Sequence, residues 1–291
     1  MSQTPSFDRN LTEARALKSF ALSAVTIFCA ILACIPLFSV LYMLILRGGK
    51  RLSFELFYAL PPTAFDTGGG FGNAILGTLV MVGIASLIAV PFGTLAAIFL
   101  AEFGENSKIA DIARFCAKTM TGIPSILAGV LAYTAVVMVT GTYSAIAGGI
   151  ALSLLMIPTV MLTAEESIKM VPSIMREAAV GIGCTKTQVM WKVMLPVAMP
   201  GMITGVMLAV ARASGETAPL LFTALFSDYW MFQGGAGDIM EPTASLAVLI
   251  YNFSGMPFDN QIELAWAASL VLVVIVFIIN ITSRMLFQKK K

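Results

Sequence analysis

Two opposite charges lie within an otherwise apolar stretch, and they have the clearest chemistry in this chain. Arg212 and Glu216 are four positions apart, so on a helix they lie on the same side and can form an ion pair. A charge inside a membrane is costly unless it is paired or faces water, so it indicates a functional site. The pair could neutralise itself and hold the bundle together. Alternatively, Arg212 could bind a passing oxyanion through its planar set of donors while Glu216 limits the affinity.

A second group of candidate residues lies in the charged segment 169–200. A short helix is predicted over Ile174–Val180, with Ser173 as its start. Gly181 and Gly183 are predicted to break this helix, and Thr185 is predicted to start a second short helix over Lys186–Leu195, which Pro196 ends. The segment is therefore predicted to be a compact helix-turn-helix at the face of the membrane.

Several common kinds of chemistry are excluded by what the chain lacks. It has no histidine, which excludes histidine metal sites and histidine acid–base catalysis. It has no G-x-x-x-x-G-K-[ST] loop, so it cannot itself hold ATP. An intramembrane enzyme acting on lipid would need several polar groups at one depth, and the apolar segments offer one Arg and one Glu. The sequence therefore argues against an enzyme.

The elements that must position these residues are membrane-spanning helices. The chain is 58% hydrophobic and only 12% charged, whereas a soluble domain is about 25% charged. A helix needs about 20 apolar residues to cross the hydrocarbon core, and the uncharged stretches predict six spans. The third stretch breaks near residues 140–143 into a hairpin of two helices, and the fourth continues past Arg212 to Phe226. The uncharged stretches are Ser19–Leu46, Thr67–Ala101, Thr119–Ala164, Val193–Ala211 and Leu264–Ser283.

The basic residues predict the orientation, because Lys and Arg favour the cytoplasmic side of a membrane. With the N-terminus inside, 14 of the 18 basic residues lie in inner segments, and the outer segments hold only Arg47, Lys50 and Arg51. The predicted outer loop Phe226–Glu263 has no Lys or Arg. We therefore predict a cytoplasmic tail over 1–18, a membrane domain over 19–287 with its 169–200 loop cytoplasmic, and a basic cytoplasmic tail over 288–291.

The 169–200 segment resembles a motif of ABC importer permeases. Glu177, Ala178, Ala179, Gly183, Val193, Leu195 and Pro196 match the EAA loop, EAA-x3-G-x9-I-x-LP, with valine in place of the usual isoleucine. The resemblance implies that this loop couples the spans to a cytoplasmic ATPase. Small Ala178 and Ala179 would let the surface of that partner approach, and Gly183 would permit the turn. ATP and Mg²⁺ would then be bound by the ATPase, with no cofactor on this chain.

Other stretches are similar to phosphate-specific ABC permeases, and most closely to the shorter of their two permease subunits. The string from Arg212 to Leu220 matches R-x-x-G-E-T-A-P, and GGGFGNAILGTL at 68–79, AIFLAEF at 97–103 and GIPSILAG at 122–129 look like the same family. The resemblance implies an all-α integral membrane fold, a six-helix type I ABC importer permease bundle, with Arg212, Glu216 and Thr217 on the substrate path.

The same resemblance implies the partners and the location of the chain. They are a second permease subunit, two copies of the ATPase, an extracytoplasmic phosphate-binding protein and the surrounding lipid of a bacterial cytoplasmic (inner) membrane, with no nucleic acid. Three alternatives stay open. The same architecture could carry molybdate, sulfate or a phosphonate, because Arg212 does not distinguish these oxyanions. The others are a lipid-modifying intramembrane enzyme and a scaffold, although a scaffold needs no docking loop.

Overall fold

The computed structural model describes residues 14–104, 107–232 and 239–288, and all regular structure within them is helical. This confirms the predicted all-α membrane fold. Within these residues, five helices are long and apolar enough to cross a membrane. They are α1 (Ala14–Met43) with its extension through α2 (Gly49–Arg51), α3 (Gly72–Ile98), α7 (Ala145–Lys169), α10 (Leu195–Ser214) and α13 (Asp259–Gln288).

The third of the predicted spans is not one continuous helix. Helix α4 (Lys108–Gly122) meets α5 (Ser125–Ala132) at a bend of 106°. The cause is Pro124, which disfavours helical geometry at the residue before it, and Ile123 has an extended ψ of 138°. The chain reaches six spans only when this bent pair counts as one.

The predicted hairpin after this pair is confirmed. Helix α5 continues through η4 (Tyr133–Val137) into α6 (Met138–Thr140), which is followed by Gly141 in a left-handed conformation with φ of +76°. Helix α7 then begins after Ser144, whose hydroxyl accepts a hydrogen bond from the backbone N–H of Ala147 at 3.1 Å. A positive-φ glycine and a serine N-cap are the usual local signals for such a helix–helix turn.

Pro196 does not end the second helix of the 169–200 segment, contrary to the sequence prediction. Helix α9 (Lys186–Val189), the π-helical turn η5 (Met190–Met194) and α10 form one helix of 29 residues over Lys186–Ser214. Pro196 has no N–H to donate, and the π-helical turn immediately before it provides the local rearrangement through which helices accommodate such residues. The helix also ends at Ser214 and not at Phe226, and α11 (Ala218–Thr223) begins after a break at residues 215–217.

Helices α3, α7 and α10 pack closely because small residues lie at their contacts. A Cβ added to Gly205 of α10 would lie only 2.0 Å from Thr163 Oγ1 of α7. Close packing of this kind is typical of membrane helices. The buried side chains between these helices form the main core, which includes Met81, Ala85, Leu152, Val160 and Ala209.

Gly205→Ala is therefore expected to destabilise the fold by about 1–3 kcal/mol, because the added methyl group overpacks a tight contact. Gly83→Ala is the control, since a Cβ at Gly83 meets nothing within 4 Å. Thermal unfolding in detergent should show a lower melting temperature for the first variant only. Equal melting temperatures would contradict the close approach of α10 to α7.

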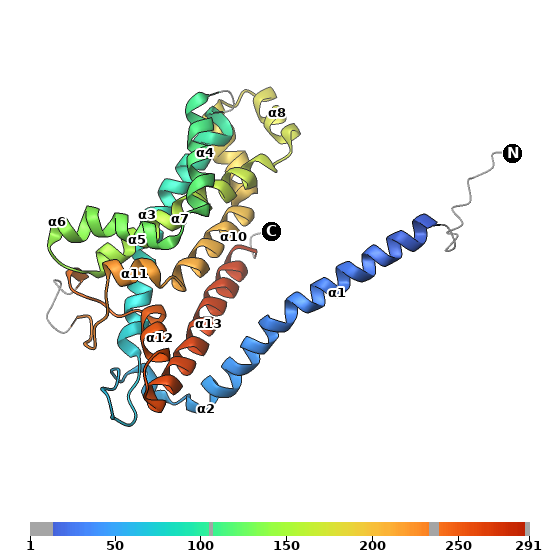
Figure 1. Cartoon of the computed structure of the whole chain (residues 1–291). Coiled ribbons are helices and arrows are strands. Elements are labelled where there is room, and N and C mark those ends of the chain that lie inside the picture. Colours follow the sequence, from blue (N-terminus) through green and yellow to red (C-terminus); the bar gives the residue numbers. More distant parts are fainter. Residues whose placement is uncertain (1–13, 105–106, 233–238, 289–291) are drawn as a thin grey trace.

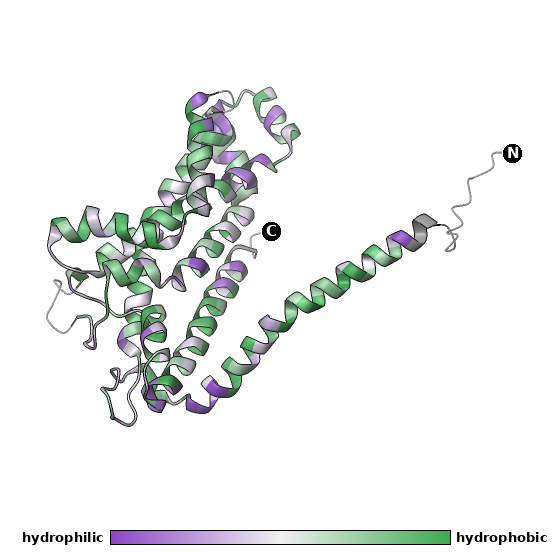
Figure 2. Ribbon diagram, viewed as in Figure 1, coloured by the Kyte–Doolittle hydropathy of each residue, from purple (hydrophilic) through white to green (hydrophobic). Residues whose placement is uncertain are grey.

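A second core lies at the opposite end of the bundle from the 169–200 turn. There η2 (Phe54–Phe57) and α12 (Leu246–Ser254) pack against α13, with Leu56, Phe71 and Leu264 fully buried. Figure 1 shows α12 and α2 at this end and α8 (Ser173–Gly181) at the other. Helix α1 leaves the bundle at α2 and is hydrophobic along most of its length (Figure 2). Its apolar side chains are almost all exposed. Lipid or another protein must cover them.

Candidate functional site

The 169–200 segment forms the predicted helix-turn-helix, and its turn requires glycine. Helix α8 begins at Ser173, with Pro172 and not Ser173 at the N-cap. At its end, the Cys184 N–H donates to the Ala179 carbonyl at 3.0 Å and the Gly183 N–H donates to the Val180 carbonyl at 2.9 Å. These two bonds make a Schellman motif, whose left-handed residue is usually glycine. Gly183 has φ of +88°, and a Cβ there would meet nothing within 4 Å, so the requirement comes from the backbone alone.

The second helix of the turn begins with a capping box, which confirms Thr185 as its start. The Thr185 N–H donates to Gln188 Oε1 at 2.9 Å, and the Gln188 N–H donates to Thr185 Oγ1 at 3.4 Å. Ala179 is buried against Val189 and Met190 of this helix. The expectation that Ala179 faces a partner is therefore wrong, because its small side chain lets the two helices of the turn pack together.

Some of the other predicted coupling residues lie on α8 and in the turn, and the rest lie in the long helix that follows. Glu177 and Ala178 are exposed on α8, and so is Gly183 in the turn. Leu195 is half-buried and Pro196 exposed, and both lie within the continuous helix over Lys186–Ser214. The exposed residues adjoin large exposed apolar side chains, and apolar patches of this kind mark protein interaction sites. On α8 and the turn after it, Ile174, Val180 and Ile182 are 71%, 55% and 82% exposed.

An ion pair that no sequence motif predicts joins the turn to the end of α3. Arg176 Nη2 of α8 lies 2.6 Å from Glu102 Oε2, in the π-helical turn η3 (Phe99–Phe103) after α3. The Glu102 side chain is only 6% exposed. A buried carboxylate needs such a partner. Glu102 lies in the AIFLAEF stretch, which the sequence comparison with phosphate permeases included. Its pairing with a residue 74 positions later could not be predicted from that stretch.

A second set of ion pairs joins α4 to α7 at the same end of the bundle. Arg114 Nε lies 2.7 Å from Glu165 Oε1, and Arg114 Nη2 donates to the Leu100 carbonyl at 2.8 Å. Lys169 Nζ lies 2.6 Å from the same carboxylate oxygen. Glu165 is buried, so it neutralises two cations where water is scarce. These contacts fix the bent α4 against α7.

Glu165→Gln is expected to cost about 1.5–3 kcal/mol of stability, because hydrogen bonds to charged groups are lost and Arg114 keeps no buried counter-charge. Glu166→Gln is a matched control, since Glu166 is exposed and makes the same change of charge one residue away. Thermal unfolding of the two purified variants measures the difference. A loss of stability in both variants alike would show that the effect is one of net charge and not of this ion pair.

The second predicted site lies at the break between α10 and α11, where the structure brings its three residues together. Arg212 is in the last turn of α10, Glu216 is in the break and Thr217 is the N-cap residue of α11. Pro219 lies in the first turn of α11, so it begins a helix instead of disrupting one. Non-helical backbone at membrane depth is tolerated only where protein buries it or where it lines a water-filled cavity.

The predicted Arg212–Glu216 pair is present, but its geometry is loose. Arg212 Nε lies 3.4 Å from Glu216 Oε1, compared with about 2.7–2.9 Å for a strong charge-assisted hydrogen bond. The Arg212 side chain is 45% exposed and that of Glu216 is 16% exposed. The guanidinium therefore keeps donors that no other residue in the described part of the chain uses.

The break also lies close to the bent span. A Cβ added to Gly129 of α5 would lie 2.6 Å from Pro219 Cα at the start of α11. Helix α5, which follows the bend in the third span, thus packs against α11, which follows the break after α10. This contact between residues 90 positions apart positions the two breaks together.

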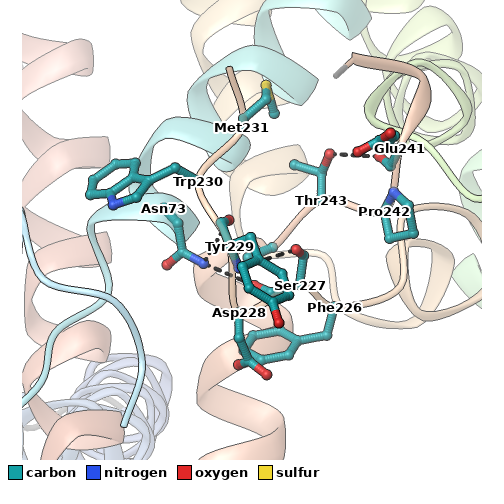
Figure 3. Close-up of a pocket in the computed structure, with 11 residues that line it drawn as sticks. Asn73, Phe226, Ser227, Asp228, Tyr229, Trp230, Met231, Glu241, Pro242 and Thr243 are labelled. Carbon is teal, nitrogen blue, oxygen red and sulfur yellow. Dashed lines mark hydrogen bonds between the residues drawn. The ribbon is translucent and has the colours of Figure 1, made fainter. Parts of the chain in front are cut away.

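A cavity of about 660 Å³ lies near segment 226–231, which is predicted to be on the outer side, and its lining does not favour an anion. Asn73 holds this segment in place, because its Nδ2 donates to the carbonyls of Ser227 and Tyr229 at 2.8 and 3.4 Å (Figure 3). Asp228 and Glu241 line the cavity, and none of its eleven lining residues is basic. Negative charge repels an oxyanion, so this cavity is a poor candidate for a phosphate site.

A bundle of membrane-length helices, interrupted at a charged pair and bearing an exposed helical turn at one end, defines a polytopic membrane protein. The family model described as "Binding-protein-dependent transport system inner membrane component" matches residues 89–291. The chain belongs to this family, and it is a multi-pass inner-membrane protein.

Curated relatives match over most of their length. A phosphate transport system permease protein PstA of Haemophilus influenzae is 40% identical over 252 residues, which are 87% of this chain and 87% of the relative. The PstA protein of Yersinia pestis is 38% identical over 87% of this chain and 84% of the relative. The similarity thus extends well beyond the short motifs.

Solved structures share the fold at low sequence identity. A chain of a bacterial alginate ABC transporter, in complex with a periplasmic protein bound to an alginate pentasaccharide, superposes with a TM-score of 0.64 at 14% identity. The match covers 94% of this chain and 96% of that one. A chain of the inward-facing MetNI methionine ABC transporter superposes with a TM-score of 0.56 at 19% identity, over 75% and 92% of the two chains. These likenesses concern the fold alone.

Proposed function

We propose that this chain is the permease subunit of an ATP-driven importer of inorganic phosphate. The observation that carries the proposal is the identity of 38–40% with PstA phosphate permeases over 87% of the chain. The charged break supports it, because Arg212 is exposed and only loosely paired. A guanidinium with free donors suits the oxygens of a phosphate. Arg212, Glu216 and Thr217 would border the path of the anion.

The continuous helix supplies a mechanical link between the two sites. Because Pro196 does not end it, the helix over Lys186–Ser214 runs from the turn that would meet the ATPase to Arg212. Its 29 residues extend roughly 40 Å at about 1.5 Å per residue. A movement of the turn would therefore shift the Arg212 end of the same element. The exposed face of α8 would dock on the ATPase, which binds ATP and Mg²⁺.

The remaining partners in this proposal are a second permease subunit, two ATPase copies and an extracytoplasmic phosphate-binding protein. The test is uptake by the complete reconstituted complex, supplied in parallel with labelled phosphate, sulfate and molybdate. We expect ATP-dependent accumulation of phosphate only. Accumulation of sulfate or molybdate without phosphate would assign the chain to another oxyanion, and no accumulation of any of them by an assembled complex would contradict an import function.

The predicted orientation can be tested with two single cysteines in a background where Cys29, Cys34, Cys116 and Cys184 are replaced by serine. Tyr229 and Ile182 are 73% and 82% exposed and lie on opposite predicted sides. A membrane-impermeant thiol reagent added to intact cells should label Tyr229→Cys and leave Ile182→Cys unlabelled until the membrane is broken. The opposite pattern would reverse the topology.

A further inference from the structure

The outer ends of α1 and α13 meet in a cluster of opposite charges that the proposed transport function does not use. Arg47, Lys50 and Arg51 come from the end of the α1–α2 helix, and Asp259 and Glu263 come from the first turns of α13. With Ile262 and Trp266 they line a cavity of about 500 Å³. The junction is tightly built, because a Cβ at Gly48 would lie 2.6 Å from the Trp266 carbonyl.

The three cations differ in how they are held. Arg51 is bound within the protein, donating to Asn260 Oδ1 at 3.0 Å and to the Gly68 carbonyl at 3.3 Å, and its Nε is 3.8 Å from Glu263 Oε2. Arg47 lies over the Trp266 ring at 5.2 Å, with no ion pair in the described part of the chain. Lys50 is exposed and makes no hydrogen bond or ion pair within the described residues. Two of the three cations are thus available to a ligand.

The cavity lies where lipid headgroups are expected. Helix α1 is strongly apolar and almost wholly exposed, so much of its surface requires an apolar environment. The apolar run ends at Leu46, and the first cation follows immediately. Trp is enriched at the membrane–water interface, and Arg and Lys side chains near helix ends extend toward it. These basic residues are also the only ones in the predicted outer segments, so the general preference for basic residues on the inner side does not explain them.

We propose that this cavity binds the headgroup of a zwitterionic aminophospholipid from the outer leaflet. Its phosphate would lie between Arg47 and Lys50, and its ammonium group would lie toward Asp259 and Glu263. A purely anionic headgroup would meet the same two carboxylates without a positive group to satisfy them. Free phosphate would meet them too, and it has no acyl chain to contact Ile262 and Trp266. The mixture of charges therefore selects a headgroup that carries both signs.

The test uses the whole purified complex in nanodiscs that contain phosphatidylethanolamine, phosphatidylglycerol and phosphatidylcholine with identical acyl chains. Native mass spectrometry then measures which lipids the complex retains. We expect preferential retention of phosphatidylethanolamine, and a loss of roughly tenfold when Arg47 and Lys50 are both changed to Gln. The double change Asp259→Asn and Glu263→Gln should remove the preference for phosphatidylethanolamine over phosphatidylglycerol. Lys108→Gln with Lys118→Gln, which removes two exposed cations elsewhere, is the control.

Three results would overturn the proposal. The first is equal retention of phosphatidylethanolamine by the wild-type complex and by Lys50→Gln, a single variant that cannot misfold through lost contacts. The second is displacement of the lipid by inorganic phosphate, which would show that the site selects the free anion. The third is cross-linking of a photoreactive group at position 50 to another protein subunit, which would show that protein fills the cavity. Transport activity does not enter these measurements, so they stand apart from the proposed function.

Discussion

Phosphate uptake is expected to fall strongly when Arg212 is changed to Gln and not to recover when Glu216 is changed to Gln as well, although the complex still assembles. If the two residues only neutralised each other, the double variant would lose two costly charges together. Its phosphate uptake would then be higher than that of either single variant. The loose pairing and the exposed guanidinium argue instead that Arg212 meets the anion. A lost charge-assisted hydrogen bond of about 1.5–3 kcal/mol lowers uptake by roughly tenfold or more.

The measurement is uptake of labelled phosphate into vesicles that carry equal amounts of the assembled Arg212→Gln, Glu216→Gln and double variants. Arg212→Lys provides a further comparison. It should restore uptake only in part, because a point charge cannot reproduce the bidentate geometry of a guanidinium. Near-normal uptake by the double variant would show that Arg212 has a structural role and does not contact the anion.

Gly183→Val is the second variant from which we expect a large effect. A left-handed residue with a Cβ costs about 1–2 kcal/mol, and β-branched side chains fit that conformation worst. The end of α8 would rearrange and the two hydrogen bonds that close it would break. Because this turn is the proposed contact with the ATPase, uptake and ATPase association should both fall sharply, while the permease still inserts in the membrane.

Gly181→Val is the matched control for this variant. Gly181 is also exposed, also has nothing within 4 Å of an added Cβ, and has no positive φ. Co-purification of the ATPase and uptake per assembled complex should therefore change little in this variant. Loss of both in Gly181→Val would mean that bulk at the turn matters and not the backbone conformation. Unchanged coupling in Gly183→Val would mean that another surface meets the ATPase.

The helix-turn-helix of the 169–200 segment shows which features local sequence signals can predict. The roles of Gly183 and Thr185 were predictable because the hydrogen bonds that close a helix end or cap a helix start join residues only a few positions apart. Pro196 was misread, because the local rule that proline ends a helix takes no account of a π-helical turn in front of it. Ala179 was misread for a different reason. Its small size serves packing against Val189, and burial depends on how two helices meet.

At the charged site, too, some features were predictable from the sequence and others were not. The four-residue spacing of Arg212 and Glu216 made their pairing predictable, and the hydropathy of the chain made the membrane predictable. The close approach of Pro219 to Gly129 of the bent span was not predictable, because the two residues lie 90 positions apart. The ion pair of Glu102 with Arg176 likewise joins residues from separate elements.

The sequence by itself therefore determined the membrane class, most of the helices and which residues are candidates for binding an anion or a partner. Hydropathy, capping and spacing are local properties, and each can be evaluated from neighbouring residues. The tertiary structure alone decided which helices are continuous, which small residues are buried and which charges neutralise each other. Those outcomes depend on distances between segments far apart in the chain, and such distances arise only when the helices pack.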